Sequence, residues 1–185
     1  MIKRCFFLSL LLPFVASAGM VVPEAIRAPA EQVAKLTVHA VGDQIYQCVL
    51  QDNVYAWQTQ APDAKLFDMK GQIVGNHYSG PIWEYKEGSR VVGRVVSKLD
   101  VDLGESIPWL LVEVVAHHGA GMFSDINYIN RVNTRGGLSP SSSCNANHLG
   151  SEKRVNYTAD YILVQSGPVA HPGGLICLEK VFMSA

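Results

Sequence analysis

Three histidines and one glutamate are the residues of this chain that could bind a metal ion or transfer protons. His77, His118 and His148 each lie within two residues of a glycine. Three neutral imidazoles could bind Zn²⁺ and leave one coordination position open, and a histidine beside Glu84 could transfer protons. The chain lacks the HExxH and HxH spacings that place two imidazoles together. We therefore predict no metal and no cofactor, with a metal or acid–base site as the alternative.

Aromatic and polar residues gather in the same motifs as these histidines and form a candidate ligand-binding set. Four of them lie in one expected strand–turn–strand unit, one opens a glycine turn, and one lies on a later strand. The six candidates are His77, Tyr78, Trp83, Glu84, His118 and Arg131. An arginine can bind a carboxylate or a phosphate through two parallel hydrogen bonds. For Arg131 we expect instead an ion pair with Glu84 or Glu113 inside the fold.

The tryptophans and serines add weaker signals. Trp57, Trp83 and Trp109 could stack on sugar rings, although large aromatic side chains more often fill a core. Trp109 lies in the most apolar segment, so we expect it in the core, whereas polar neighbours leave Trp83 open to either role. The serines at 141–143 lie in a polar run and not in a GxSxG turn, so no catalytic nucleophile is predicted.

The N-terminus has the order of an export signal. Two basic residues, Lys3 and Arg4, precede an apolar run that ends in the small residues Ala16, Ser17 and Ala18. This order predicts a cleaved signal peptide over residues 1–18 and a periplasmic or secreted protein. Without Lys3 and Arg4, the basic residues fall from 15 to 13 against 16 acidic ones, a net charge of −3. Residues 19–185 have no basic tract to bind nucleic acid and no apolar run long enough to span a membrane.

Short runs of β-forming residues separated by turn residues fill the rest of the chain. Their spacing predicts an all-β fold, a single-domain antiparallel sandwich or barrel of short strands. We expect the β domain over residues 19–166 and a C-terminal tail over 167–185. Gly42-Asp43 and Lys70-Gly71 are expected hairpin turns, and Pro108 with its β-branched neighbours favours a strand over residues 107–116.

Three cysteines follow the signal, namely Cys48, Cys144 and Cys177. In an oxidising compartment two of them are expected to pair, and three pairings are possible. Cys48 with Cys144 would close a long loop, but the residues alone do not select it. Their spacing fits no CxxC metal pattern.

The order of several motifs resembles a known family. The motifs are APDAKLFD (61–68), GNHYSGPIWE (75–84), IPWLL (107–111), HGAGMF (118–123), YINRVNTRGG (128–137) and YTADY (157–161). This pattern is similar to that of domain-of-unknown-function family 3455, which groups secreted bacterial and fungal proteins of unsettled activity. The resemblance implies a bond between Cys48 and Cys144, and it leaves residues 167–185, with Cys177, outside the family pattern. A malate dehydrogenase label carried by some fungal relatives has no basis here, because no GxGxxG turn is present.

These observations favour a protein that binds a small molecule or glycan in a cleft or barrel mouth. The alternatives are a metal-dependent or hydrolytic enzyme of the cell envelope and a structural envelope protein without a small ligand. Convergence of His77, His118 and Arg131 in one pocket would favour the binding protein or the enzyme, and their dispersal would favour the structural protein.

Overall fold

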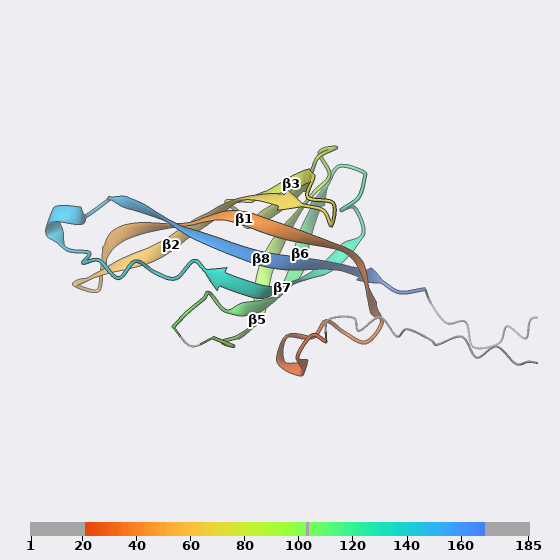
Figure 1. The fold of residues 1–185 in the computed structure, drawn as a ribbon, viewed down its shortest axis with the longest axis horizontal. Helices are drawn as coiled ribbons and strands as arrows, with labels where there is room; N and C mark the ends of the chain where they lie inside the picture. The colour runs from red at the N-terminus through yellow and green to blue at the C-terminus, as the bar shows by residue number, and fades with distance from the viewer. Residues whose placement is uncertain (1–20, 103, 169–185) are drawn as a thin grey trace, which may run out of the picture.

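The protein is a closed antiparallel β-barrel in which each strand pairs with the next along the chain (Figure 1). The computed structural model describes residues 21–102 and 104–168. The eight strands are β1 (Gln32–Gln51), β2 (Val54–Phe67), β3 (Ile73–Tyr78), β4 (Ile82–Tyr85), β5 (Arg90–Leu99), β6 (Trp109–His118), β7 (Ile126–Gly136) and β8 (Glu152–Ser166). Pairing of β8 with β1 closes the ring. The predicted all-β fold is confirmed, and of its two forms the barrel is the one observed.

The first hairpin corrects one sequence prediction. Gly42 does not form a turn but lies in the middle of the single long strand β1. A Cβ atom at Gly42 would lie 2.2 Å from the carbonyl oxygen of Asp63 and 2.4 Å from the Cα atom of Ala64, so this glycine allows β2 to approach closely. The chain turns instead at Asp52 and Asn53, whose φ angles of 51° and 61° are those of a type I′ turn.

Alternation along the strands divides the apolar residues between the barrel interior and an outer cluster. Val112 and Tyr161 point inward with Trp83 and Leu66. Their neighbours on the opposite face, including Leu111 and Ile162, form the outer cluster with Val132 and Ile26. Ile26 belongs to the short 3₁₀ helix η1 (Glu24–Ile26), and its side chain is fully buried against the outer wall.

A disulfide anchors one end of the barrel. The hairpin of β1 and β2 and the start of β8 extend beyond the shorter strands, and the second 3₁₀ helix, η2 (Ala146–His148), lies at that end (Figure 1). Cys48 near the end of β1 is bonded to Cys144 just before η2. The pairing that the family resemblance implied is therefore confirmed.

The expected signal peptide over residues 1–18 and Cys177 lie outside the described residues. Within the part of the chain that is described, no helix is both long enough and apolar enough to cross a membrane.

Candidate functional site

The six candidate residues from the sequence divide between the two faces of the barrel wall. On the β3–β4 hairpin, His77 and Trp83 are register partners and both point inward. Their rings stack with centroids 4.0 Å apart and planes 15° apart, and the edge of Tyr161 meets both. Arg131 on β7 pairs in register with Tyr161 and also points inward.

Burial fixes the charge state of His77. Its Nδ1–H donates to the carbonyl oxygen of Ile82 at 2.8 Å. Loss of solvent is the main cause that lowers the pKa of this imidazole to about 3, partly offset by the bond to Ile82. His77 is therefore neutral at physiological pH, and its ring satisfies the buried carbonyl oxygen of Ile82.

Tyr78, Glu84 and His118 lie on the outer wall. Glu84 pairs in register with Arg90, and Arg90 pairs with His118, so these side chains form a row across three strands. The Tyr78 hydroxyl donates to Glu84 at 2.5 Å, and this bond to the carboxylate is the main cause that raises the pKa of Tyr78. The outer row is exposed at its His118 end.

The histidines considered as metal ligands are not brought together. His77 is inside the barrel, His118 is on the outer wall, and His148 is in η2, where its Nδ1 lies 3.0 Å from the side-chain oxygen of Asn145. Among the described residues, no group of three or more His, Cys, Asp or Glu side chains could hold a metal ion.

Arg131 does not form the ion pair expected from the sequence. Its Nε and Nη2 atoms donate to the carbonyl oxygen of Pro108 at 3.1 and 2.8 Å. Glu113 pairs with Arg94 on the outer wall, and Glu84 accepts from Tyr78. Alternation places both glutamates on the opposite face of the wall from Arg131, which is why the pairing fails.

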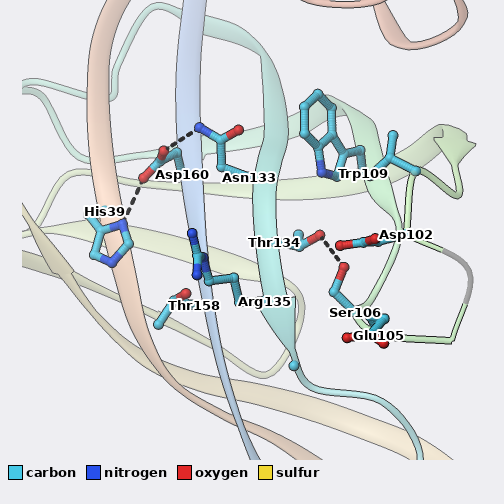
Figure 2. A pocket seen from close by; sticks show the side chains of 12 residues that line it. His39, Asp102, Glu105, Ser106, Trp109, Asn133, Thr134, Arg135, Thr158 and Asp160 are labelled. Atoms are coloured by element: carbon cyan, nitrogen blue, oxygen red, sulfur yellow. Dashed lines mark hydrogen bonds and ion pairs between the residues drawn. The ribbon is translucent and has the colours of Figure 1, made fainter.

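A groove with a volume of about 880 Å³ lies on the outer wall (Figure 2). We call it the outer groove. Strands β1, β8 and β7 form one side, and the other side is formed by Val101, Asp102, Glu105, Ser106 and Trp109. None of its polar residues is among the six candidates predicted from the sequence.

A chain of hydrogen bonds lies along the strand side of the outer groove. Nδ1 of His39 is 2.7 Å from one carboxylate oxygen of Asp160, and the Asn133 amide donates to the other oxygen at 2.8 Å. Since the carboxylate accepts, the proton of a neutral His39 is on Nδ1, and Nε2 carries a lone pair. The side chain of His39 is 49% exposed, so this pair is accessible from solvent.

A bulge in β7 sets the directions of the β7 side chains that line the outer groove. The register with β8 shifts between Val132 and Arg135, and Asn133 has a φ of 50°, a left-handed conformation that few non-glycine residues adopt. Thr134 turns inward instead and donates to the carbonyl of Ile107 at 2.6 Å. Such strain persists where surrounding contacts enforce it, and it is concentrated at functional sites.

Trp109 forms the far side of the outer groove. Sequence analysis expected it in the core, but the structure places it half-buried on the outer wall, packed against the cluster that contains Ile26. One face of the groove is therefore aromatic. Among the described residues, three acidic side chains line the groove, namely Asp102, Glu105 and Asp160, and one basic side chain, Arg135. With histidine neutral, the charges of these lining residues sum to −2.

Sequence reasoning missed the outer groove because its key pair is far apart in the chain. His39 and Asp160 are separated by 121 positions and meet only through the β1–β8 pairing that closes the barrel. The one local signal was the NTRGG run at 133–137, which the structure shows to be the end of the bulged strand.

Comparison with known proteins gives a family but no activity. The family model described as "Protein of unknown function (DUF3455)" matches residues 29–165, which include all of the polar outer-groove residues. A search of curated proteins and a search of solved structures found no match.

Proposed function

This chain belongs to the DUF3455 family of proteins of unknown function, and we propose that it binds a neutral or amino-bearing saccharide in the outer groove. The observation that carries the proposal is the strained bulge at Asn133. It brings an amide and the guanidinium of Arg135 beside the His39–Asp160 pair, opposite the face of Trp109.

The shape and lining of the outer groove suit a sugar ring. Its volume of about 880 Å³ is within the roughly 300–1,000 Å³ of small-molecule sites. A pyranose has apolar C–H faces that stack on an indole and a rim of hydroxyls that bond to planar polar groups. Trp109 offers the first kind of contact, while Asp160, Asn133 and Arg135 offer the second.

The charge of the outer groove narrows the ligand class. Three carboxylates against one guanidinium repel uronic acids and phosphorylated sugars, because like charges brought together oppose binding. Neutral sugars and sugars that carry an amine are compatible with this field.

An extracytoplasmic location is part of the proposal. The bond between Cys48 and Cys144 is of the kind that persists in oxidising compartments, and the N-terminal pattern of residues 1–18 is that of an export signal. A protein in the periplasm or outside the cell meets envelope and extracellular glycans, which are the ligands proposed.

Calorimetry with three tetrasaccharides tests the proposal. The probes are the N-acetylglucosamine tetramer, the glucosamine tetramer and tetragalacturonate. We expect one or both of the first two to bind and the acidic third to fail. Trp109→Ala should weaken binding by about 1–3 kcal/mol, the range of a buried aromatic contact, whereas Trp57→Ala, outside the groove, should leave the affinity unchanged. Failure of all three, or equal loss in both variants, would contradict the proposal.

A hydrolytic enzyme is the second candidate, and the His39–Asp160 pair favours it. A carboxylate that holds Nδ1–H orients an imidazole so that Nε2 can accept a proton from water. If the pair is catalytic, the bound tetramer should be cleaved and His39→Gln should abolish cleavage while binding persists. Recovery of intact tetramer after prolonged incubation would exclude hydrolysis and would leave saccharide binding as the only proposed function.

A further inference from the structure

The interior of the barrel contains a second, smaller cavity that the outer groove does not use. We call it the lumen cavity. Its volume is about 110 Å³, and its lining includes Gln44, His77, Trp83, Arg131 and Tyr161. One water needs roughly 10–15 Å³, so several waters or a ligand of a few heavy atoms can fit.

One buried polar side chain that lines the lumen cavity lacks a partner. Trp83 is 2% exposed, and its Nε1–H has no hydrogen-bond acceptor among the described residues. Gln44, which is 5% exposed, also lines the cavity and carries an amide. A buried donor left unpaired is unfavourable by about 1–3 kcal/mol, so such groups are expected to meet an acceptor.

The described lining of the lumen cavity carries positive charge and no negative charge. Arg131 uses two of its five N–H groups on the carbonyl of Pro108 and a third on the Tyr161 hydroxyl, which leaves two donors for a ligand. None of the described residues that line the cavity carries a carboxylate. Burial keeps His77 neutral by lowering its pKa and keeps Tyr161 protonated by raising its pKa.

Part of the lining of the lumen cavity is partly exposed at the barrel wall. The residues are Pro62 on β2, Pro81 immediately before β4 and Val95 on β5. Val95 is 50% exposed. We expect a small solute to enter the interior beside these residues.

From this geometry we infer that the lumen cavity binds a small monocarboxylate of acetate size. One carboxylate oxygen accepts from the free N–H groups of Arg131 and the other from Trp83 or Gln44. The guanidinium gains a counter-charge that none of the described lining residues supplies, and the unpaired Trp83 donor gains an acceptor. The few carbon atoms of the acid meet the faces of the interior rings.

Titration with sodium acetate, followed by the indole N–H signals of the full protein, tests this inference. Ionic strength is held constant with sodium gluconate, a carboxylate too large for the cavity. We expect a saturable downfield shift of the Trp83 signal. The Trp57 signal, whose N–H already bonds to Ser142, and the Trp109 signal should stay unchanged. The readout is independent of the outer groove, so the two proposals can fail separately.

Variants assign the effect to the lumen cavity. Arg131→Gln should weaken acetate binding at least tenfold, and Gln44→Leu, which removes only an amide, by roughly threefold to tenfold. Arg94→Gln is the matched control, because Arg94 pairs with Glu113 on the outer wall, and it should bind as the wild type does. If Arg131→Gln does not fold, the Gln44 variant decides.

Three results would overturn the inference. They are a Trp83 signal that does not move, one that moves without saturation or equally with gluconate, and acetate binding that Arg131→Gln and Gln44→Leu leave unchanged. Each would mean that water alone satisfies the interior donors.

Discussion

Removal of the Cys48–Cys144 bond should lower the stability of the barrel by several kcal/mol. The bond joins residues 96 positions apart. In the chain-entropy account, a crosslink that closes a loop of about 100 residues stabilises the fold by about 4.7 kcal/mol at 25 °C. Other contacts hold the same segment in place, since Trp57 Nε1 donates to Ser142 at 2.8 Å and Lys153 donates to it at 2.6 Å. The native state should therefore change little, and the effect should arise mainly in the unfolded chain.

Urea unfolding followed by tryptophan fluorescence measures this effect. The double variant Cys48→Ala, Cys144→Ala should lose about 3–5 kcal/mol relative to the oxidised protein, with a larger m value because its unfolded chain is less compact. Cys177→Ala is the matched control and should unfold as the wild type does. A loss below about 1 kcal/mol in the double variant would refute the loop-entropy reasoning, and a large loss in the control would refute the assigned pairing.

Three further predictions concern the barrel wall. Gly93→Val should destabilise the fold by about 1–3 kcal/mol in thermal unfolding, because a Cβ atom there would lie 2.4 Å from Val112 and 2.8 Å from the Trp83 ring; an unchanged melting temperature would contradict the packing described. The folded-state pKa of His77 is lowered to about 3, so the stability due to its neutral form is present above about pH 6.5 and is lost as the pH falls towards 3, by about 1.4 kcal/mol per pH unit. Urea unfolding at pH 7.5 and pH 4.5 should show this loss of unfolding free energy in the wild type, and His77→Phe should show a smaller loss; an equal loss in both proteins would count against the burial argument. Asn133→Val should destabilise by roughly 1–3 kcal/mol because a β-branched residue resists a φ of 50°, whereas Asn133→Gly, which adopts this φ without strain but loses side-chain bonds such as the one to Asp160, should destabilise less; the opposite order in chemical denaturation would argue against strain at the bulge.

The class of fold was predictable because strand signals are local. The β-branched run at residues 107–116 predicted a strand, and β6 (Trp109–His118) occupies this region. The turn at Lys70-Gly71 was also correct, since β2 ends at Phe67 and β3 begins at Ile73. Gly42 was misread because a glycine in a turn and a glycine that allows close strand contact look the same in a sequence.

The candidate sites were only partly predictable because they depend on which face of the wall each residue occupies. His77, Trp83 and Arg131 do converge, but inside the barrel and apart from His118. The pairing of Arg131 with a glutamate failed because alternation places Glu113 on the other face. No local pattern could reveal a site whose parts meet only when the barrel closes.

The same alternation explains the position of Trp109. Its segment is the most apolar of the chain, which predicted burial in a core. In the structure β6 is apolar on both faces, since one face meets the lumen and the other meets the cluster around Ile26. Trp109 is on the second face, where its packing leaves part of the indole free for the outer groove.

The central claim, saccharide binding in the outer groove, is tested most directly by the indole N–H spectrum during addition of the N-acetylglucosamine and glucosamine tetramers. We predict a saturable shift of the Trp109 signal with at least one tetramer. The signals of Trp57 and Trp83 should not shift. Asp160→Asn should weaken this shift, because it alters the carboxylate that holds both His39 and Asn133. An unchanged Trp109 signal with both tetramers at millimolar concentration, or a shift that Asp160→Asn leaves intact, would contradict the account.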